Sequence, residues 1–110
     1  MDNCIFCKII KGEIPKDFLY ESDSLVVFAD IHPSADIHIL IVPKEHIVGI
    51  GDLSESHAKL LSEIYSLVNK LVKENKLEQD SYRVVVNGGK AQHISHIHFH
   101  LLGGKWYKFI

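Results

Sequence analysis

The chain has 110 residues and a formal net charge of -2 at pH 7, with 46% hydrophobic and 24% charged side chains. These values are typical of one globular domain, residues 1–110, whose core is small. The lysines are spread along the chain, so there is no basic cluster of the kind that binds nucleic acid. No apolar run is long enough for a signal peptide or a membrane span. We therefore expect a cytoplasmic protein without nucleic-acid or membrane partners.

The first half of the chain predicts one short helix and three strands. Residues 5–11 form a helical turn that ends at Gly12, and Pro15 follows shortly after. Residues 17–22 and 24–31 predict two strands, and the second of them is rich in β-branched and aromatic side chains. Residues 38–43 predict a third, apolar strand that stops at Pro43.

The second half predicts a long helix followed by two strands. The helix begins after Ser54, and apolar residues from Leu60 to Val72 recur every three or four positions, so that they share one face. Residues 82–87 and 96–102 predict the last strands. Because several connections have hairpin lengths, we expect an α+β fold: an antiparallel sheet of about five strands, one long helix and a short N-terminal helix.

Three histidines alternate with apolar residues in the last predicted strand, as His96, His98 and His100. Side chains alternate across a strand, so these histidines share one face while Ile97 and Phe99 point to the core. Neighbours on one face lie about 7 Å apart, close enough for the rings to converge on one ligand or metal. Two chemistries suit this pattern: a three-histidine metal site, or an imidazole that acts as nucleophile and acid-base group on a phosphate.

Cys4 and Cys7 form a C-x-x-C pair near the start of the chain. In the cytosol such a pair does not form a structural disulfide, and it supplies half of a tetrahedral zinc site. His46 and one histidine of the triplet are candidates for the two remaining ligands. From the residues alone, a redox pair and two core cysteines remain alternatives.

Three stretches, taken in order, resemble the histidine-triad (HIT) family, and in particular its Hint branch of nucleoside phosphoramidate hydrolases. They are CIFCKIIKGEIP, FADIHPSADIHILIVPKEHI and YRVVVNGGKAQHISHIHFHLLGG, and together they cover nearly the whole chain. The resemblance implies a HIT-like fold and an enzyme that cleaves the P–N bond of nucleoside 5′-phosphoramidates. It also implies a covalent nucleotidyl-histidine intermediate, the release of a purine nucleoside monophosphate (AMP- or GMP-like), and a homodimer.

The resemblance assigns catalytic roles to three histidines. His98 matches the family's nucleophile, His100 a donor to the phosphate, and His38 a support for the hydrogen-bond relay. Asp30 matches the acid that binds the ribose hydroxyls, although its place before His32-Pro33 also suits a turn former. The full set of nucleotide-binding residues implied by the resemblance is Ile5, Phe6, Phe28, Asp30, Ile31, Asn87, Gln92, His93, His98 and His100.

For the metal, the resemblance implies a structural zinc ion held by Cys4, Cys7, His46 and His96, with no metal required for the chemistry. Under this assignment His96 belongs to the structure and His98 to the reaction. Three alternatives remain open: a dinucleoside polyphosphate hydrolase, a non-catalytic nucleotide sensor or scaffold, and a metalloenzyme that uses all three histidines of the triplet as ligands. The loop from Asn87 to Gln92 is two residues shorter than in similar proteins, which leaves the placement of the phosphate open.

Overall fold

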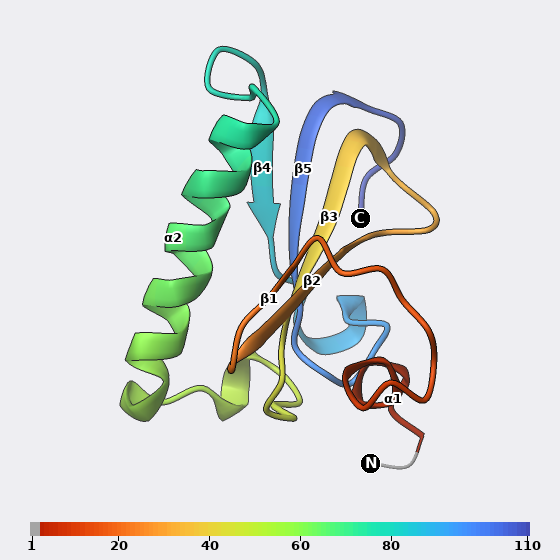
Figure 1. The fold of residues 1–110 in the computed structure, drawn as a ribbon, viewed down its shortest axis with the longest axis vertical. Coiled ribbons are helices and arrows are strands. Elements are labelled where there is room, and N and C mark those ends of the chain that lie inside the picture. The colour runs from red at the N-terminus through yellow and green to blue at the C-terminus, as the bar shows by residue number, and fades with distance from the viewer. Residues whose placement is uncertain (1–2) are drawn as a thin grey trace.

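The strands of the chain pair into a five-stranded antiparallel sheet in the order β1-β2-β3-β5-β4 (Figure 1). The structure is a computed structural model, and it describes residues 3–110. The strands are β1 Tyr20–Glu21, β2 Leu25–Ala29, β3 Ala35–Pro43, β4 Tyr82–Val85 and β5 Phe99–Trp106. The predicted α+β class and antiparallel sheet are thereby confirmed.

Among residues 3–110, two α-helices accompany the sheet, α1 Ile5–Ile10 and α2 Ala58–Glu74. The same residues contain three single turns of 3₁₀ helix, at Ile50–Asp52, Glu55–His57 and Gly89–Ala91. The long helix starts later than predicted because Glu55–His57 tightens into a 3₁₀ turn, which is closed by a hydrogen bond from the Ser54 N–H to His57 Nδ1 at 3.0 Å. Within residues 3–110, no helix combines the length and the apolar character needed to span a bilayer.

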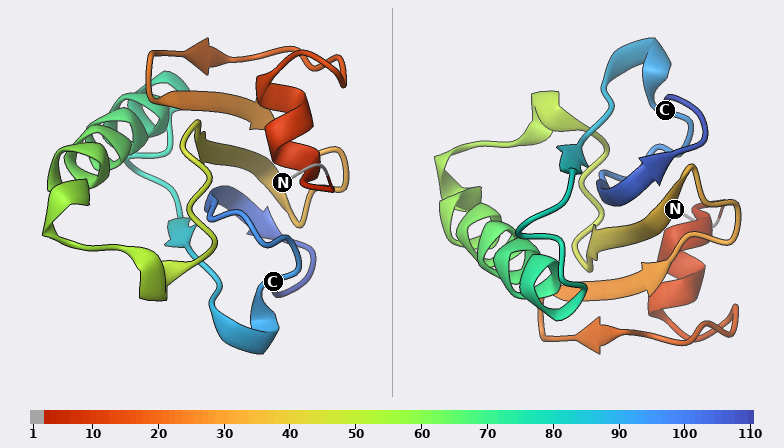
Figure 2. Two further views of the ribbon diagram at one scale, coloured as in Figure 1. Left: turned by 90° about the horizontal axis from the view of Figure 1, so that it is seen from below. Right: turned by 90° about the horizontal axis from the view of Figure 1, so that it is seen from above.

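The two helices lie on opposite faces of the sheet, as Figure 2 shows. Successive side chains of β2 and β3 point to opposite faces of the sheet. Both faces of these strands are largely buried, so both sets of side chains are mostly apolar. Leu25, Val27, Ile39 and Ile41 pack into the core beneath α2. Their neighbours along the strands, Val26, Phe28, Leu40 and Val42, pack into the smaller core beneath α1.

The last strand begins at Phe99, three residues later than the predicted start at His96. The partner strand β3 ends at Pro43, which has no N–H to extend the ladder. Beyond this point the Ile97 N–H donates instead to the Ile47 carbonyl at 2.7 Å. His96 therefore lies outside the strand, and its ring approaches the sulfurs of Cys4 and Cys7, as the family resemblance predicts.

Candidate active site and metal cluster

A relay of hydrogen bonds fixes the protons on two of the histidines. The Ser34 N–H donates to His38 Nδ1 at 2.9 Å, so the neutral His38 ring carries its proton on Nε2. His38 Nε2 lies 2.9 Å from His100 Nδ1 and therefore donates to it. The antiparallel pairing of β3 with β5 places these two rings together. The relay leaves the proton of His100 on Nε2.

The Nε2–H of His100 is an unpaired donor. The atom is buried and has no hydrogen-bond partner among residues 3–110. Leaving a buried donor unsatisfied costs about 1–3 kcal/mol, so such groups in folded proteins call for a reason. A ligand with acceptor oxygens, such as a phosphate, can supply the missing partner.

His98 has the opposite arrangement of protons. Its Nδ1 lies 2.8 Å from the backbone carbonyl of His96, and a carbonyl only accepts, so Nδ1 carries the proton. The Nε2 of the neutral ring consequently keeps its lone pair, which is the form that attacks an electrophile. The rings of His98 and His100 lie side by side, with centroids 4.9 Å apart. A nucleophilic nitrogen and an N–H donor are thus neighbours.

Burial keeps these three imidazoles neutral. It lowers the pKa of His98 and of His38 below the usual value, and nearby Asp30 opposes the shift in each case. Burial also lowers the pKa of His100 to about 4, helped by the neighbouring His98 and His38 and opposed by Asp30. At neutral pH the site therefore presents uncharged rings in defined tautomers.

The histidines line a cavity of about 300 Å³, which we call the histidine cavity. Six residues predicted from the sequence to act in catalysis or nucleotide binding line it: Asp30, His38, Asn87, His93, His98 and His100. The Asp30 carboxylate both stabilises a turn and faces the histidine cavity, the two roles considered for it from the sequence. Its Oδ1 accepts the His32 N–H at 2.8 Å, as in a turn, and its Oδ2 lies 3.5 Å from His38 Nε2.

Five other predicted nucleotide-binding residues lie elsewhere. The side-chain amide of Gln92 donates to the carbonyls of Val48 and Ile94 and so holds the loop that precedes the triad. Phe6 and Phe28 are buried in the core beneath α1. The edge of the Phe6 ring packs against His98, with centroids 5.0 Å apart. Ile31 is exposed, at 72% of its surface, and Ile5 lines a separate cavity described below.

Several residues of the histidine cavity were not predicted. Ser34 acts through its backbone N–H, which no side-chain pattern reveals. Lys108 and its neighbours in the C-terminal segment line the same cavity. They arrive there because the Tyr107 N–H donates to the Ser34 carbonyl at 2.7 Å and the Tyr107 hydroxyl donates to Asp36. The positive charge of Lys108 also contributes to the lowered pKa of His38.

Cys4, Cys7, His46 and His96 form a second cluster, and their ligand atoms all lie within 4.8 Å of one another. His96 Nδ1 is 3.4 and 3.6 Å from the two sulfurs and 3.1 Å from His46 Nδ1. Tetrahedral zinc with two sulfur and two nitrogen ligands needs separations of about 3 to 4 Å. His96 Nε2 donates to the Pro43 carbonyl at 2.7 Å, which leaves the Nδ1 lone pair free for a metal. The donor set therefore fits zinc.

The start of α1 brings the two cysteines together. Cys4 caps the helix, and its sulfur accepts the Cys7 N–H at 3.3 Å. Cys7 lies one turn further on, with its sulfur 3.1 Å from His46 Nδ1. This cluster and the histidine cavity use different side chains, so the metalloenzyme with all three triad histidines as ligands does not match the arrangement.

A neutral imidazole with a free lone pair, close to an unpaired N–H donor, suits attack on an anionic centre. Comparison with known proteins agrees. Residues 3–108 match the family model described as "Scavenger mRNA decapping enzyme C-term binding". The purine nucleoside phosphoramidase of Escherichia coli (strain K12) is 38% identical over 106 residues, which cover 94% of this chain and 89% of that protein. The "14 kDa zinc-binding protein" of Zea mays is 43% identical over 105 residues, covering 92% and 81%.

Solved structures show the same relationship. A HIT family hydrolase from Legionella pneumophila Philadelphia 1 superposes with a TM-score of 0.90 at 40% identity, covering 97% of each chain. A histidine triad protein from Clostridium difficile gives a TM-score of 0.88 at 40% identity, covering 100% of this chain and 96% of that chain. The chain belongs to the histidine-triad (HIT) family, and it is an enzyme of the hydrolase type found there.

Proposed function

We propose that the protein hydrolyses the P–N bond of purine nucleoside 5′-phosphoramidates and releases the nucleoside monophosphate. One observation carries the proposal: the ring of His98, whose Nε2 keeps its lone pair, and the ring of His100, whose Nε2–H is unpaired, have centroids 4.9 Å apart. The names of relatives support the substrate class, since they include the purine nucleoside phosphoramidase of E. coli and an adenosine 5′-monophosphoramidase of Candida albicans.

In the first step His98 Nε2 attacks the phosphorus. The Nε2–P bond forms, the P–N bond to the amine breaks, and the amine nitrogen takes up a proton from solvent water as it leaves. His98 keeps its Nδ1 proton, so the nucleotidylated ring is cationic. The hydrogen bond from this Nδ1–H to the His96 carbonyl stabilises the positive charge. The Nε2–H of His100 donates to a phosphate oxygen, which relieves its unpaired state.

In the second step water attacks the same phosphorus. A P–O bond to the water oxygen forms as the Nε2–P bond breaks, and the water gives up a proton to solvent. The neutral imidazole returns, and the nucleoside monophosphate leaves. A cationic imidazole is a good leaving group, so the intermediate is reactive toward water. The relay from Ser34 through His38 holds His100 in the same tautomer through both steps.

The remaining cavity residues bind the substrate. Asp30 accepts hydrogen bonds from the ribose hydroxyls, and Asn87 and His93 donate to the phosphate oxygens. Zinc in the Cys4, Cys7, His46 and His96 cluster ties α1 to the loop before β5 and takes no part in bond making. The support for zinc is the fit of the donor set and the name of the maize relative.

We also propose that the enzyme is a cytoplasmic homodimer. The support is an open edge: β4 is the last strand of the sheet, and the side chains of Tyr82 on this strand and Tyr65 on α2 are both about half exposed. Light scattering of the purified protein tests the assembly, with twice the mass of one chain as the expected result.

The function is tested by steady-state hydrolysis of adenosine 5′-phosphoramidate by the wild type and by His98→Ala. We expect turnover by the wild type and a loss of at least about a thousandfold in the variant. His57→Ala is the matched control, because His57 lies in the turn before α2, outside the histidine cavity. Nucleotide binding by the wild type without turnover would contradict the proposal and favour a nucleotide sensor. Turnover of dinucleoside polyphosphates alone would favour that hydrolase class instead.

A further inference from the structure

The histidine cavity contains a lysine to which the proposed reaction gives no role. Lys108 comes from the segment after β5, and it is the only lysine or arginine among the described residues that line this cavity. Its positive charge reaches the site, since it contributes to the lowered pKa of His38. Lys108 forms no ion pair within residues 3–110, so its charge is available to a ligand.

Two backbone hydrogen bonds bring Lys108 to the start of the histidine relay. The pairing of β5 with β3 ends at Trp106. Beyond it, the N–H groups of Tyr107 and Lys108 both donate to the Ser34 carbonyl, at 2.7 and 3.4 Å. The N–H of the same Ser34 donates to His38 Nδ1. The backbone of Lys108 therefore lies next to the residue that fixes the His38 tautomer.

The side chain of Asp36 holds this segment in place. It accepts the Lys105 N–H at 3.0 Å and the Tyr107 hydroxyl. Gly104 makes the close approach of the chain possible, because its φ is +76° and a Cβ there would lie 2.8 Å from Asp36 Oδ2. Tyr107, one residue before Lys108, is thereby fixed through both its backbone and its side chain.

The phosphate of a phosphoramidate brings negative charge into a site that has little to balance it. Burial keeps the rings of His38, His98 and His100 neutral. Asp30 adds a carboxylate to the same cavity. An anion beside a carboxylate is unfavourable in a partly buried site unless a cation is near. Lys108 is the residue of the cavity whose charge can balance it.

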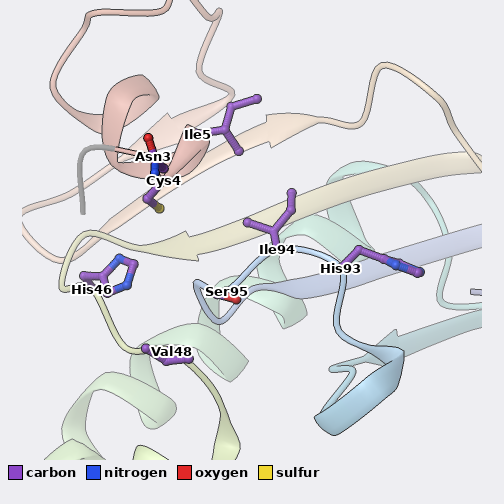
Figure 3. A pocket seen from close by; sticks show the side chains of 8 residues that line it. All are labelled: Asn3, Cys4, Ile5, His46, Val48, His93, Ile94 and Ser95. Carbon is purple, nitrogen blue, oxygen red and sulfur yellow. The ribbon is translucent and has the colours of Figure 1, made fainter.

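The neighbouring cavity offers no such charge. It measures about 600 Å³ and lies between the start of α1 and the loop that precedes β5 (Figure 3). His93 lines both cavities, but none of the described residues around the larger one is a lysine or an arginine. Zinc held by the thiolates of Cys4 and Cys7 would be neutral overall. A phosphate is therefore favoured in the histidine cavity, where His98 and Lys108 both lie.

We propose that Lys108 is a catalytic residue that binds the phosphate of the substrate and balances its negative charge during attack by His98. Tyr107 is the positioning residue that holds Lys108 over the cavity. This inference rests on the proposed function and adds two residues to its machinery. Fixed cations that face a reacting phosphate stabilise the transition state without reorganisation of solvent.

Binding is measured first, because it does not depend on turnover. Isothermal titration calorimetry compares AMP, which carries a phosphate, with adenosine, which does not. For Lys108→Gln we expect the Kd of AMP to rise about tenfold and that of adenosine to stay within about twofold. Lys105→Gln is the matched control, because it removes the same charge from the same segment and Lys105 does not line the cavity. An unchanged Kd for AMP, or an equal change for both ligands, would overturn the proposal.

Steady-state hydrolysis of adenosine 5′-phosphoramidate then tests the catalytic role. We expect kcat/KM to fall about tenfold or more in Lys108→Gln, and about threefold or less in Lys108→Arg, which keeps the charge. Lys105→Gln is expected to keep the wild-type value. Equal losses in the Gln and Arg variants would overturn the role of the charge.

Tyr107→Phe tests the positioning role, because it removes only the hydroxyl that Asp36 accepts. We expect it to lower kcat/KM in the wild-type background and to have no further effect in Lys108→Gln. Additive losses would refute this role. Binding of AMP that depends on Lys108, without turnover by the wild type, would instead refute the proposed function while supporting the phosphate contact.

Discussion

The backbone carbonyl of His96 accepts the Nδ1–H of His98 at 2.8 Å, while the side chain of His96 faces Cys4 and Cys7. His96 therefore contributes to both clusters. Its ring lies in the proposed metal site, and its carbonyl fixes the tautomer of His98, the proposed nucleophile. Phe6 lies between the two cysteines in the chain and packs edge-on against both His96 and His98. Four predictions follow from these clusters and from the packing of β5, before the direct test of the reaction.

Removal of the metal is expected to destabilise the fold. Zinc bound to the two sulfurs and two ring nitrogens would cross-link α1 to His46 and His96, and a chelator would remove this link. We expect a chelator to lower the Tm by about 10 °C or more, which corresponds to about 2 kcal/mol for a domain of this size. Differential scanning calorimetry measures this shift, and added zinc is expected to restore the Tm. A Cys4→Ser variant with the wild-type Tm would contradict the prediction.

Replacement of His38 by Phe is expected to slow the reaction without weakening substrate binding. The variant leaves His100 Nδ1 without a donor, so His100 no longer presents its Nε2–H in a fixed tautomer. We expect kcat to fall about 10- to 100-fold with little change in KM. His38→Gln, whose amide donates to His100, is expected to recover part of the rate. The ¹⁵N chemical shifts of His100 report the tautomer directly, and unchanged shifts in the Phe variant would refute this role.

Acid is expected to destabilise the fold through His100. Its pKa is about 4 in the folded protein, against about 6.5 in an unfolded chain. Between these values the unfolded chain binds the proton and the folded chain does not, so stability rises with pH from about 4 to 6.5 and is then level. The contribution is about 2 to 3 kcal/mol after allowance for solvent.

Urea unfolding at several pH values measures that contribution as the difference between wild type and His100→Gln. His38, His98 and Asp30 also affect the pKa of His100. Because both proteins contain these three groups, the difference between the proteins isolates the titration of His100. The difference in unfolding free energy is expected to shrink as the pH falls from 6.5 to 4. A difference that is independent of pH would mean that His100 titrates normally in the folded protein.

Gly103→Ala is expected to destabilise the protein. A Cβ at this position would lie 2.5 Å from Leu77 Cδ1, so the buried Leu77 side chain would have to shift. Overpacking of this kind costs about 1–3 kcal/mol. Gly51→Ala is the matched control, because a Cβ there meets no atom within 4 Å. Equal unfolding free energies for the two variants would show that Leu77 adjusts without cost.

The sequence predicted the sheet and the long helix well because their signals are local. The apolar period of α2 survives in the structure, where Ile64, Leu67, Val68, Leu71 and Val72 are buried. The start of β5 was missed because alternation of histidine with apolar residues does not show where a ladder ends. That point depends on Pro43, which is distant in the chain and ends the partner strand.

The candidate site also has a part that the sequence predicts and a part that it does not. Side-chain types, together with the family resemblance, predicted which histidines gather with Asp30 and which gather with the cysteines. The groups that fix the protons were not predictable, because they are backbone atoms: the Ser34 N–H and the carbonyls of Pro43 and His96. Gln92 also binds backbone carbonyls instead of lining the histidine cavity. Only the folded arrangement assigns a lone pair to His98 and a donor to His100.

The most direct test of the central claim is to trap the covalent intermediate. Wild-type enzyme is mixed with adenosine 5′-phosphoramidate, quenched in base during the first turnover, digested and sequenced by tandem mass spectrometry. We predict one adenylyl group, attached to His98 and absent from His98→Ala. An adenylyl group on another residue, or undiminished turnover by His98→Ala, would contradict the account.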